Sequence, residues 1–199
     1  MARPRKDGSP PATTRIETAF FAQLRAMPFQ EITVSGLVQA AGVNRNSFYY
    51  HYADLEDLAR SAVANQLVPE IPRLIAGGFG FESAQVEEVM LNAIGDDRLR
   101  HMLTVAGPNS TSELREILKD SIRSLWLDAF RLQSSDVNDE ELATMRFVLG
   151  GMLEVMSRIS ADDLREVLPR MRGLPILQAA SRIMMQTLAA AAERVASPG

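Results

Sequence analysis

The most informative part of this chain is the segment Thr33-Val-Ser-Gly-Leu-Val-Gln-Ala-Ala-Gly-Val-Asn-Arg-Asn-Ser-Phe-Tyr-Tyr-His-Tyr52. Thr33 and Asn44 belong to the residue types that cap helices, and each precedes a short run with helical spacing. Gly42 lies between these runs and can adopt the positive φ angle that a tight turn requires. The segment therefore predicts two short helices joined by a turn, which is the arrangement of a helix-turn-helix.

The second of these helices is predicted to have one apolar face and one polar face. Phe48 and Tyr52 are four residues apart, so they share a face and are expected in the core. The groups left exposed are suited to phosphate oxygens and base edges in the major groove of DNA. A tyrosine-rich helix packed on its neighbours, with its polar tips merely solvated, is the alternative. The residues predicted to be exposed are Arg45, Asn46, Ser47, Tyr49, Tyr50 and His51.

The rest of the chain also has helical patterns, and no segment shows the alternation of a strand. A first helix is expected to start at an N-cap, Thr13 or Thr14, and to end at the break Met27-Pro28. A capping box is predicted from Ser110 to Glu113. A further helix is expected from Asp54 to residues in the late seventies, with disturbances at Pro69 and Pro72. Two more are expected at about 83–94 and 97–106, and a longer one from the capping box to Ala129. The last three are expected at 138–159, from a cap at Ser160 to Gly173, and at 174–195.

The composition narrows the possible chemistry. The 199 residues include no cysteine, which excludes disulfides, thiolate metal sites and a cysteine nucleophile. The two histidines, His51 and His101, lie far apart, which disfavours a histidine metal site or a serine–histidine triad. Asp97 and His101 share one predicted helix face, but no third ligand is evident. We therefore expect no metal, no cofactor and no enzymatic activity.

Residues 1–12 are rich in proline and carry Arg3, Arg5 and Lys6. We expect a disordered arm whose basic side chains contact DNA, as such arms do in other helix-turn-helix proteins. No long apolar stretch follows these charges, and no run has the length of a membrane span. The expected location is therefore the cytoplasm, without a membrane partner.

Charge is distributed unevenly along the chain. Residues 1–52 carry six basic and three acidic side chains, whereas the remaining 147 residues carry 15 basic and 22 acidic ones. A basic head on an acidic body fits the binding of a polyanion, because the body repels the same polyanion and orients the encounter. Ordinary scatter of charge over a short segment is the alternative.

The segment from Ile32 to Leu58 resembles the DNA-binding domain of the tetracycline-repressor (TetR) family, with a match over about residues 15–58. The shared features are a threonine before the second helix, an Ala-Gly-Val turn at 41–43, the order Ser-Phe-Tyr at 47–49, and His51-Tyr52 at the end of the third helix. The resemblance implies a homodimeric transcriptional repressor. It also implies a C-terminal domain that binds a small effector and forms the dimer interface.

The resemblance assigns roles to residues of the predicted DNA-binding surface. Positions that contact phosphates in the family are matched by Thr33, Ser47, Tyr49 and His51, and positions near base edges by Ser35, Arg45, Asn46 and Tyr50. The predicted DNA-binding residues also include Asn44, the predicted N-cap of the second short helix. Departures from the family pattern are Met27-Pro28 in place of a glycine before Phe29, Asn46 in place of a common glycine, and Leu55 in place of a frequent lysine that contacts phosphate.

Candidate effector-binding residues are found in the second part of the chain. Trp126 and Phe130 form an i, i+4 aromatic pair off the main apolar stripe of their helix, where they face either a ligand cavity or a neighbouring helix. Core packing is the alternative for the methionines of this region. The full candidate set is His101, Met102, Trp126, Phe130, Phe147 and Met152.

A dimer interface is predicted from two helices, at about 140–159 and 174–195. Gly150-Gly151 lies inside a helix that is apolar around most of its circumference, and each glycine costs roughly 1 kcal/mol relative to alanine. Close approach of another helix, including one from a partner subunit, would offset this cost. A buried core helix of a monomer is the alternative.

These patterns predict an all-α protein with a disordered arm at 1–12, a three-helix, helix-turn-helix DNA-binding domain at 13–58 and a larger effector-binding and dimerisation domain at 59–199. The predicted function is that of a ligand-responsive repressor, which binds a palindromic double-stranded DNA operator as a homodimer. An all-helical small-molecule-binding protein or enzyme with a coincidental helix-turn-helix-like head is the alternative.

Overall fold

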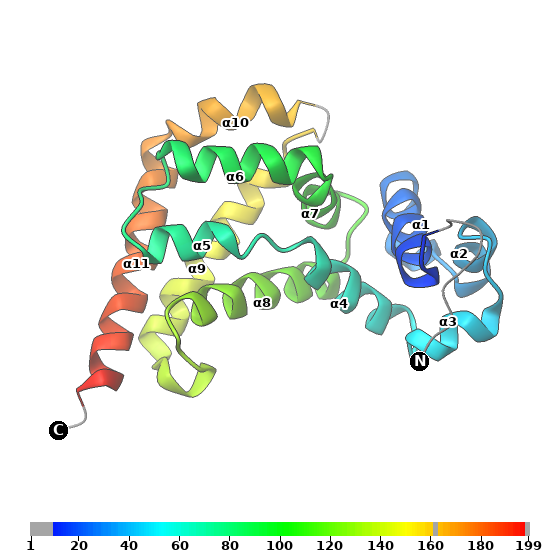
Figure 1. Ribbon diagram of the computed structural model, residues 1–199, viewed down its shortest axis with the longest axis horizontal. Coiled ribbons are helices and arrows are strands. Elements are labelled where there is room, and N and C mark those ends of the chain that lie inside the picture. The colour runs from blue at the N-terminus through cyan, green and yellow to red at the C-terminus, as the bar shows by residue number, and fades with distance from the viewer. Residues whose placement is uncertain (1–9, 161–162, 198–199) are drawn as a thin grey trace.

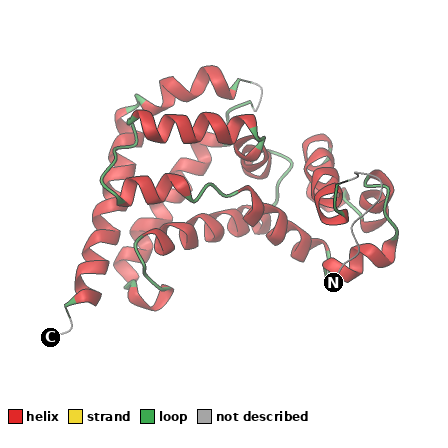
Figure 2. Ribbon diagram, viewed as in Figure 1, coloured by secondary structure: helices red, strands yellow, loops and turns green. Residues whose placement is uncertain are grey.

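A computed structural model describes residues 10–160 and 163–197, and all regular structure in these residues is helical (Figure 2). This confirms the predicted all-α class. The helices are α1 (Ala12–Ala26), α2 (Val34–Ala40), α3 (Arg45–His51), α4 (Leu55–Gln66), α5 (Glu70–Ala76), α6 (Ala84–Gly95), α7 (Arg98–Ala106), α8 (Ser112–Ala129), α9 (Asp139–Met156), α10 (Leu164–Arg172) and α11 (Pro175–Ala196). Two 3-10 turns cover Phe29–Glu31 and Ser134–Asp136.

Helices α1, α2 and α3 pack against one another at one end of the molecule (Figure 1). The predicted caps of α2 and α3 are confirmed: Thr33 accepts a hydrogen bond from the Gly36 amide, and Asn44 accepts one from the Ser47 amide at 2.7 Å. Gly42 has a φ angle of 61°, which is the turn conformation that its position predicts. Each of these interactions spans at most a few residues, so it depends little on the rest of the fold.

Three of the predicted helix boundaries are wrong. Two of them concern the first 70 residues, and the third is the predicted capping box. α1 begins at Ala12 after Pro11, and neither Thr13 nor Thr14 caps it. The helix capped by Asp54 ends at Gln66, because Pro69 has no N–H with which to continue the ladder and its ring excludes a helical backbone before it. α8 is capped by Thr111 rather than by a box starting at Ser110.

The remaining helices form a larger helical body beside α1–α3 (Figure 1). α9 and α11 pack along each other, and α8 packs against α4, α5, α7 and α9. α10 begins at Leu164 after Asp163, so it starts later than a Ser160 cap predicts, and it contacts α6 and α11. This arrangement surrounds a space that is lined by residues from α5 to α11.

One hydrophobic cluster continues from α1–α3 into the body. It includes Phe20 and Phe48 of the first three helices, Leu103 of α7 and Leu168 of α10. A second cluster lies around α8, α9 and α11, with Met145 and Leu188 among its fully buried members. Because the first cluster crosses from α1 to α7, a displacement of α7 would disturb the packing of the first three helices.

Candidate functional site

The outer surface of α3 is polar because its apolar residues are turned inward. Phe48 is fully buried and Tyr52 is 4% exposed, as predicted. Tyr50 is 83% exposed, so almost the whole of its side chain is accessible to a partner. Arg45, Asn46, Tyr49 and His51 are also exposed, whereas Ser47 is half-buried and departs from the predicted exposure.

Several side chains on this surface are ordered by contacts with each other. An Arg45 Nη atom lies 3.4 Å from the Tyr49 hydroxyl oxygen, and the guanidinium lies 5.7 Å from the centre of the Tyr49 ring. The rings of Tyr50 and His51 meet edge to face with centroids 4.9 Å apart. The contact between Arg45 and Tyr49 restricts both side chains before a partner binds, and this lowers the entropy cost of binding.

The carboxylate of Glu17 anchors the end of α3 to its neighbours. One oxygen accepts hydrogen bonds from the Tyr52 hydroxyl at 3.1 Å and from the Asn65 amide at 2.9 Å. Burial raises the pKa of Tyr52 well above its ordinary value, and the charge of Glu17 raises it further. The phenol therefore stays protonated and donates a hydrogen bond that joins α3 to α1.

The other predicted DNA-contacting residues have different positions. Thr33 and Ser35 are exposed at the start of α2, beside the turn that leads to α3. The side-chain oxygen of Asn44 is occupied by the Ser47 amide, so the Asn44 amide group is its free hydrogen-bond donor towards a partner. Arg3, Arg5 and Lys6 lie outside the described residues.

Sequence reasoning missed a basic residue that holds the turn. The Arg15 guanidinium donates a hydrogen bond of 3.2 Å to the carbonyl oxygen of Gly42, 27 residues away. This contact joins α1 to the turn between α2 and α3. Nothing in the local sequence indicates it, because both partners look like ordinary surface residues.

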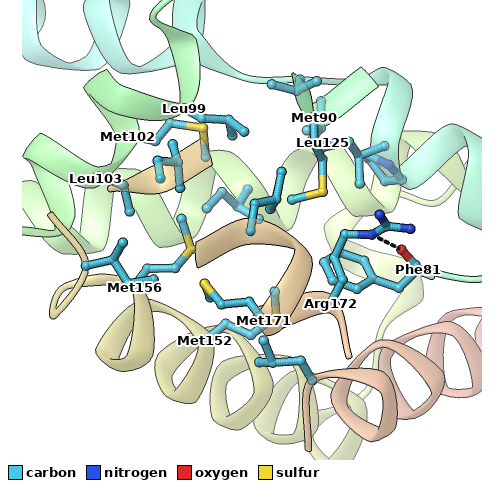
Figure 3. A pocket seen from close by; sticks show the side chains of 18 of the residues that line it. Phe81, Met90, Leu99, Met102, Leu103, Leu125, Met152, Met156, Met171 and Arg172 are labelled. Carbon is cyan, nitrogen blue, oxygen red and sulfur yellow. Dashed lines mark hydrogen bonds between the residues drawn. The ribbon is translucent and has the colours of Figure 1, made fainter. Parts of the chain in front are cut away.

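A cavity of about 140 Å³ lies within the body and is lined by segments from α5 to α11 (Figure 3). Its walls are almost entirely apolar and include five methionines. Of the predicted effector-binding residues, Met102, Trp126 and Met152 line it. The described lining residues are Val68, Ile71, Pro72, Phe81, Met90, Leu99, Met102, Leu103, Ile122, Leu125, Trp126, Met152, Met156, Ile159, Leu164, Leu168, Met171, Arg172 and Leu177.

The other three predicted effector-binding residues do not line this cavity. Phe147 is 82% exposed, because it lies on the outer face of α9. Phe130 follows the last residue of α8 and packs against the second hydrophobic cluster. His101 lies on the face of α7 that contacts α1, where its ring stacks on Phe21. Helical spacing alone could not assign these residues to a face of the folded body.

Arg172 is the charged residue that sequence reasoning missed at the cavity. It is 6% exposed and lies at the end of α10. Its Nε donates to the Phe81 carbonyl oxygen at 3.2 Å (Figure 3). One Nη donates to the carbonyl oxygens of Glu82 and Ser83. Its other Nη lies 2.6 Å from a Glu87 carboxylate oxygen. The arginine thus binds the loop before α6 to the end of α10.

His101 is placed in an environment that favours its neutral form. Its Nδ1 lies 2.9 Å from the side-chain oxygen of Gln66. Burial lowers the pKa of His101, the Arg25 charge lowers it further, and the Asp97 charge acts in the opposite direction. No group of three residues suited to metal binding occurs among the described residues, so Asp97 and His101 gain no third ligand there.

Large apolar side chains are exposed on α9 and on α11, which pack along each other. Phe147, Ile176 and Ile183 are 82%, 68% and 44% exposed. A Cβ atom at Gly150 or Gly151 would meet no described atom within 4 Å beyond the nearby backbone of α9, so these glycines do not serve close packing among the described residues. The cost of two glycines in a helix is therefore not offset by contacts within the described part of one protomer.

No model of a known protein family matches this chain, and no curated protein is significantly similar to it. Among the helices of the described residues, none is both long and apolar enough to span a membrane.

Proposed function

We infer that this protein is a DNA-binding transcriptional regulator of the TetR type, in which a small molecule controls operator binding. The observation that carries this proposal is the surface of α3, on which Arg45, Asn46 and Tyr50 are exposed while Phe48 holds the helix in the core. α2, the turn with Gly42 and α3 form a helix-turn-helix in this proposal, and α3 enters the major groove. An exposed arginine, amide and phenol are groups that read base edges.

The cavity supplies the site for the controlling ligand. α7 contributes Leu99, Met102 and Leu103 to its wall, while His101 of the same helix contacts α1. A ligand that binds better to one position of α7 therefore favours one position of α1–α3. By linkage, the factor by which the ligand weakens operator binding equals the factor by which the operator weakens ligand binding.

The exposed face of α9 and α11 supports a homodimer. Phe147 and Ile176 are large apolar side chains that remain mostly accessible in one protomer. Burying them against a second copy would be favourable, and Gly150 and Gly151 would permit close approach of the partner helix. A two-fold dimer presents two copies of α3, which fits a palindromic operator with two half-sites.

The cavity by itself also fits the alternative, an all-helical small-molecule-binding protein or enzyme without DNA-binding activity. A gel shift of the full-length protein with fragments from upstream of its own gene separates the two. We expect a saturable complex that survives excess random DNA and is weakened in Tyr50→Ala. Arg170→Ala, on the exposed surface of α10, is the control for loss of a surface side chain. If no upstream fragment forms a saturable complex, the proposal of operator binding at this locus is wrong.

A further inference from the structure

We propose that the cavity selects an uncharged, apolar ligand and excludes carboxylates, although an arginine lines it. This inference deepens the proposed function, because it names the chemical class of the controlling ligand. An arginine in a pocket is commonly a receptor for an anion. The contacts of Arg172 show why it does not have that role here.

Most donors of the Arg172 guanidinium are already engaged by the protein. Each of its three nitrogens has a partner: three carbonyl oxygens in the loop Phe81–Ser83 and the carboxylate of Glu87, at 2.6 Å. The Glu87 charge balances that of the arginine. A carboxylate ligand would find at most one further N–H on this guanidinium. A bidentate pair would displace protein partners and leave part-buried carbonyl oxygens or the Glu87 carboxylate without a donor.

The rest of the wall offers no alternative partner for a charge. Apart from Arg172, the described residues that line the cavity carry no charge, and the Trp126 indole is the other lining side chain with an N–H. An ionised ligand that enters a cavity with such a wall loses its hydration and gains no hydrogen bond or ion pair that compensates for it. An uncharged apolar ligand loses little, since apolar cavities of about 150 Å³ are known to bind molecules the size of benzene.

The five lining methionines determine how the wall adapts. Met90, Met102, Met152, Met156 and Met171 come from four different helices and surround the cavity (Figure 3). A methionine side chain is flexible and polarisable, and its sulfur makes favourable contacts with aromatic rings. We therefore expect the cavity to favour a small aromatic hydrocarbon over a charged analogue of the same ring.

The experiment titrates the full-length protein with toluene, benzoate and benzylammonium near neutral pH, where the last two are ionised. Trp126 is the only tryptophan of the chain and lines the cavity, so its fluorescence reports binding directly. We expect toluene to bind at least about tenfold more tightly than either ion. Benzoate binding within tenfold of toluene, or no binding of toluene, would overturn the inference.

Two cavity-filling variants locate the binding site. Leu103→Phe and Met171→Phe each add bulk to the cavity wall, from α7 and from α10, and either should weaken toluene binding about tenfold or more. Leu91→Phe, at an exposed position of α6, is the matched control and should leave binding unchanged. Normal toluene affinity in both folded cavity variants would place the ligand elsewhere and overturn the inference. Toluene binding without any effect on operator binding would instead count against the proposed regulation and leave the ligand class standing.

Discussion

The imidazole ring of His101 in α7 lies flat against the phenyl ring of Phe21 in α1, with centroids 4.0 Å apart and 9° between the ring planes. Leu99, Met102 and Leu103 of the same helix line the cavity. A second contact lies nearby, where the Asn109 side chain donates hydrogen bonds of 3.0 Å to the carbonyl oxygens of Leu24 and Arg25 at the end of α1. Helix α7 and the loop after it therefore join the cavity to the first three helices.

We expect His101→Ala to reduce the coupling between cavity ligand and operator. Removal of the stacked ring takes away an interaction through which movement of α7 reaches α1, and single residues of this kind change coupling by roughly 0.5–2 kcal/mol. The measurement is the operator Kd with and without toluene. Gln85→Ala, on the exposed face of α6, is the control. An unchanged ratio of the two operator Kd values in His101→Ala would show that the coupling takes another route.

The lowered pKa of His101 predicts a loss of stability in mild acid. The folded protein favours the neutral imidazole because burial lowers this pKa, whereas the unfolded chain takes up a proton at the ordinary value of 6.5. The unfolded state therefore binds more protons below that pH, and the free energy of unfolding falls as the pH falls. Urea unfolding at about pH 7.5 and about pH 5.5 tests this window around the histidine pKa.

The matched variant for this test is His101→Phe, which keeps a flat ring beside Phe21 and cannot titrate. It should lose less stability than the wild type between the two pH values, whatever its stability at the higher one. An equal loss in both proteins would mean that other groups cause the acid sensitivity.

The proposed base readout by α3 predicts that substitutions on its exposed surface lower operator affinity selectively. Tyr50→Ala and Arg45→Ala should each cost about 1–3 kcal/mol on the cognate operator and less on random DNA. Binding isotherms on both DNAs measure the difference, and Tyr50→Phe separates the phenol oxygen from the ring. Equal losses on cognate and random DNA would assign these residues to phosphate contacts.

The basic arm expected at residues 1–12 predicts that its removal changes the salt dependence of DNA binding. Deletion of residues 2–10 removes Arg3, Arg5 and Lys6, so the plot of log K against log salt should become flatter by about one unit for each phosphate that the arm neutralises. Operator affinity measured over a series of salt concentrations gives this slope. A slope equal to that of the full-length protein would exclude a contribution of the arm to DNA binding.

The proposed homodimer through the exposed face of α9 and α11 predicts that a charge on this face breaks the dimer. Phe147→Glu places a charge at the most exposed large apolar residue of this face and should convert the dimer to monomers, because an unpaired charge in an interface is unfavourable. Sedimentation velocity measures the mass in solution. Leu91→Glu, at a 38% exposed position of α6, should remain dimeric. A dimer of normal stability in Phe147→Glu would place the interface elsewhere.

Helical class and the start of α2, α3 and α4 were predictable because they depend on neighbouring residues. Thr33, Asn44 and Asp54 each accept a hydrogen bond from an amide three residues further along the chain. Gly42 adopts its positive φ angle within the same short segment. Burial of Phe48 and Tyr52 followed from their spacing on one helix face. Interactions of such short range are determined by the local order of residues, so they can be predicted from the sequence.

The cavity and the junction between α1 and α7 depend on the tertiary structure. Arg172 contacts the Phe81 carbonyl oxygen across 91 residues of sequence, and His101 meets Phe21 across a comparable gap. Helical spacing assigns a residue to the apolar or the polar face of its own helix. It does not determine which neighbouring helix packs against that face. Phe147 shows this limit. The apolar pattern of α9 suggested both Met152 and Phe147 as effector-binding residues, but Met152 lines the cavity and Phe147 lies on the surface. Only the packing of α5–α11 around a common space decides which of these side chains can touch a ligand.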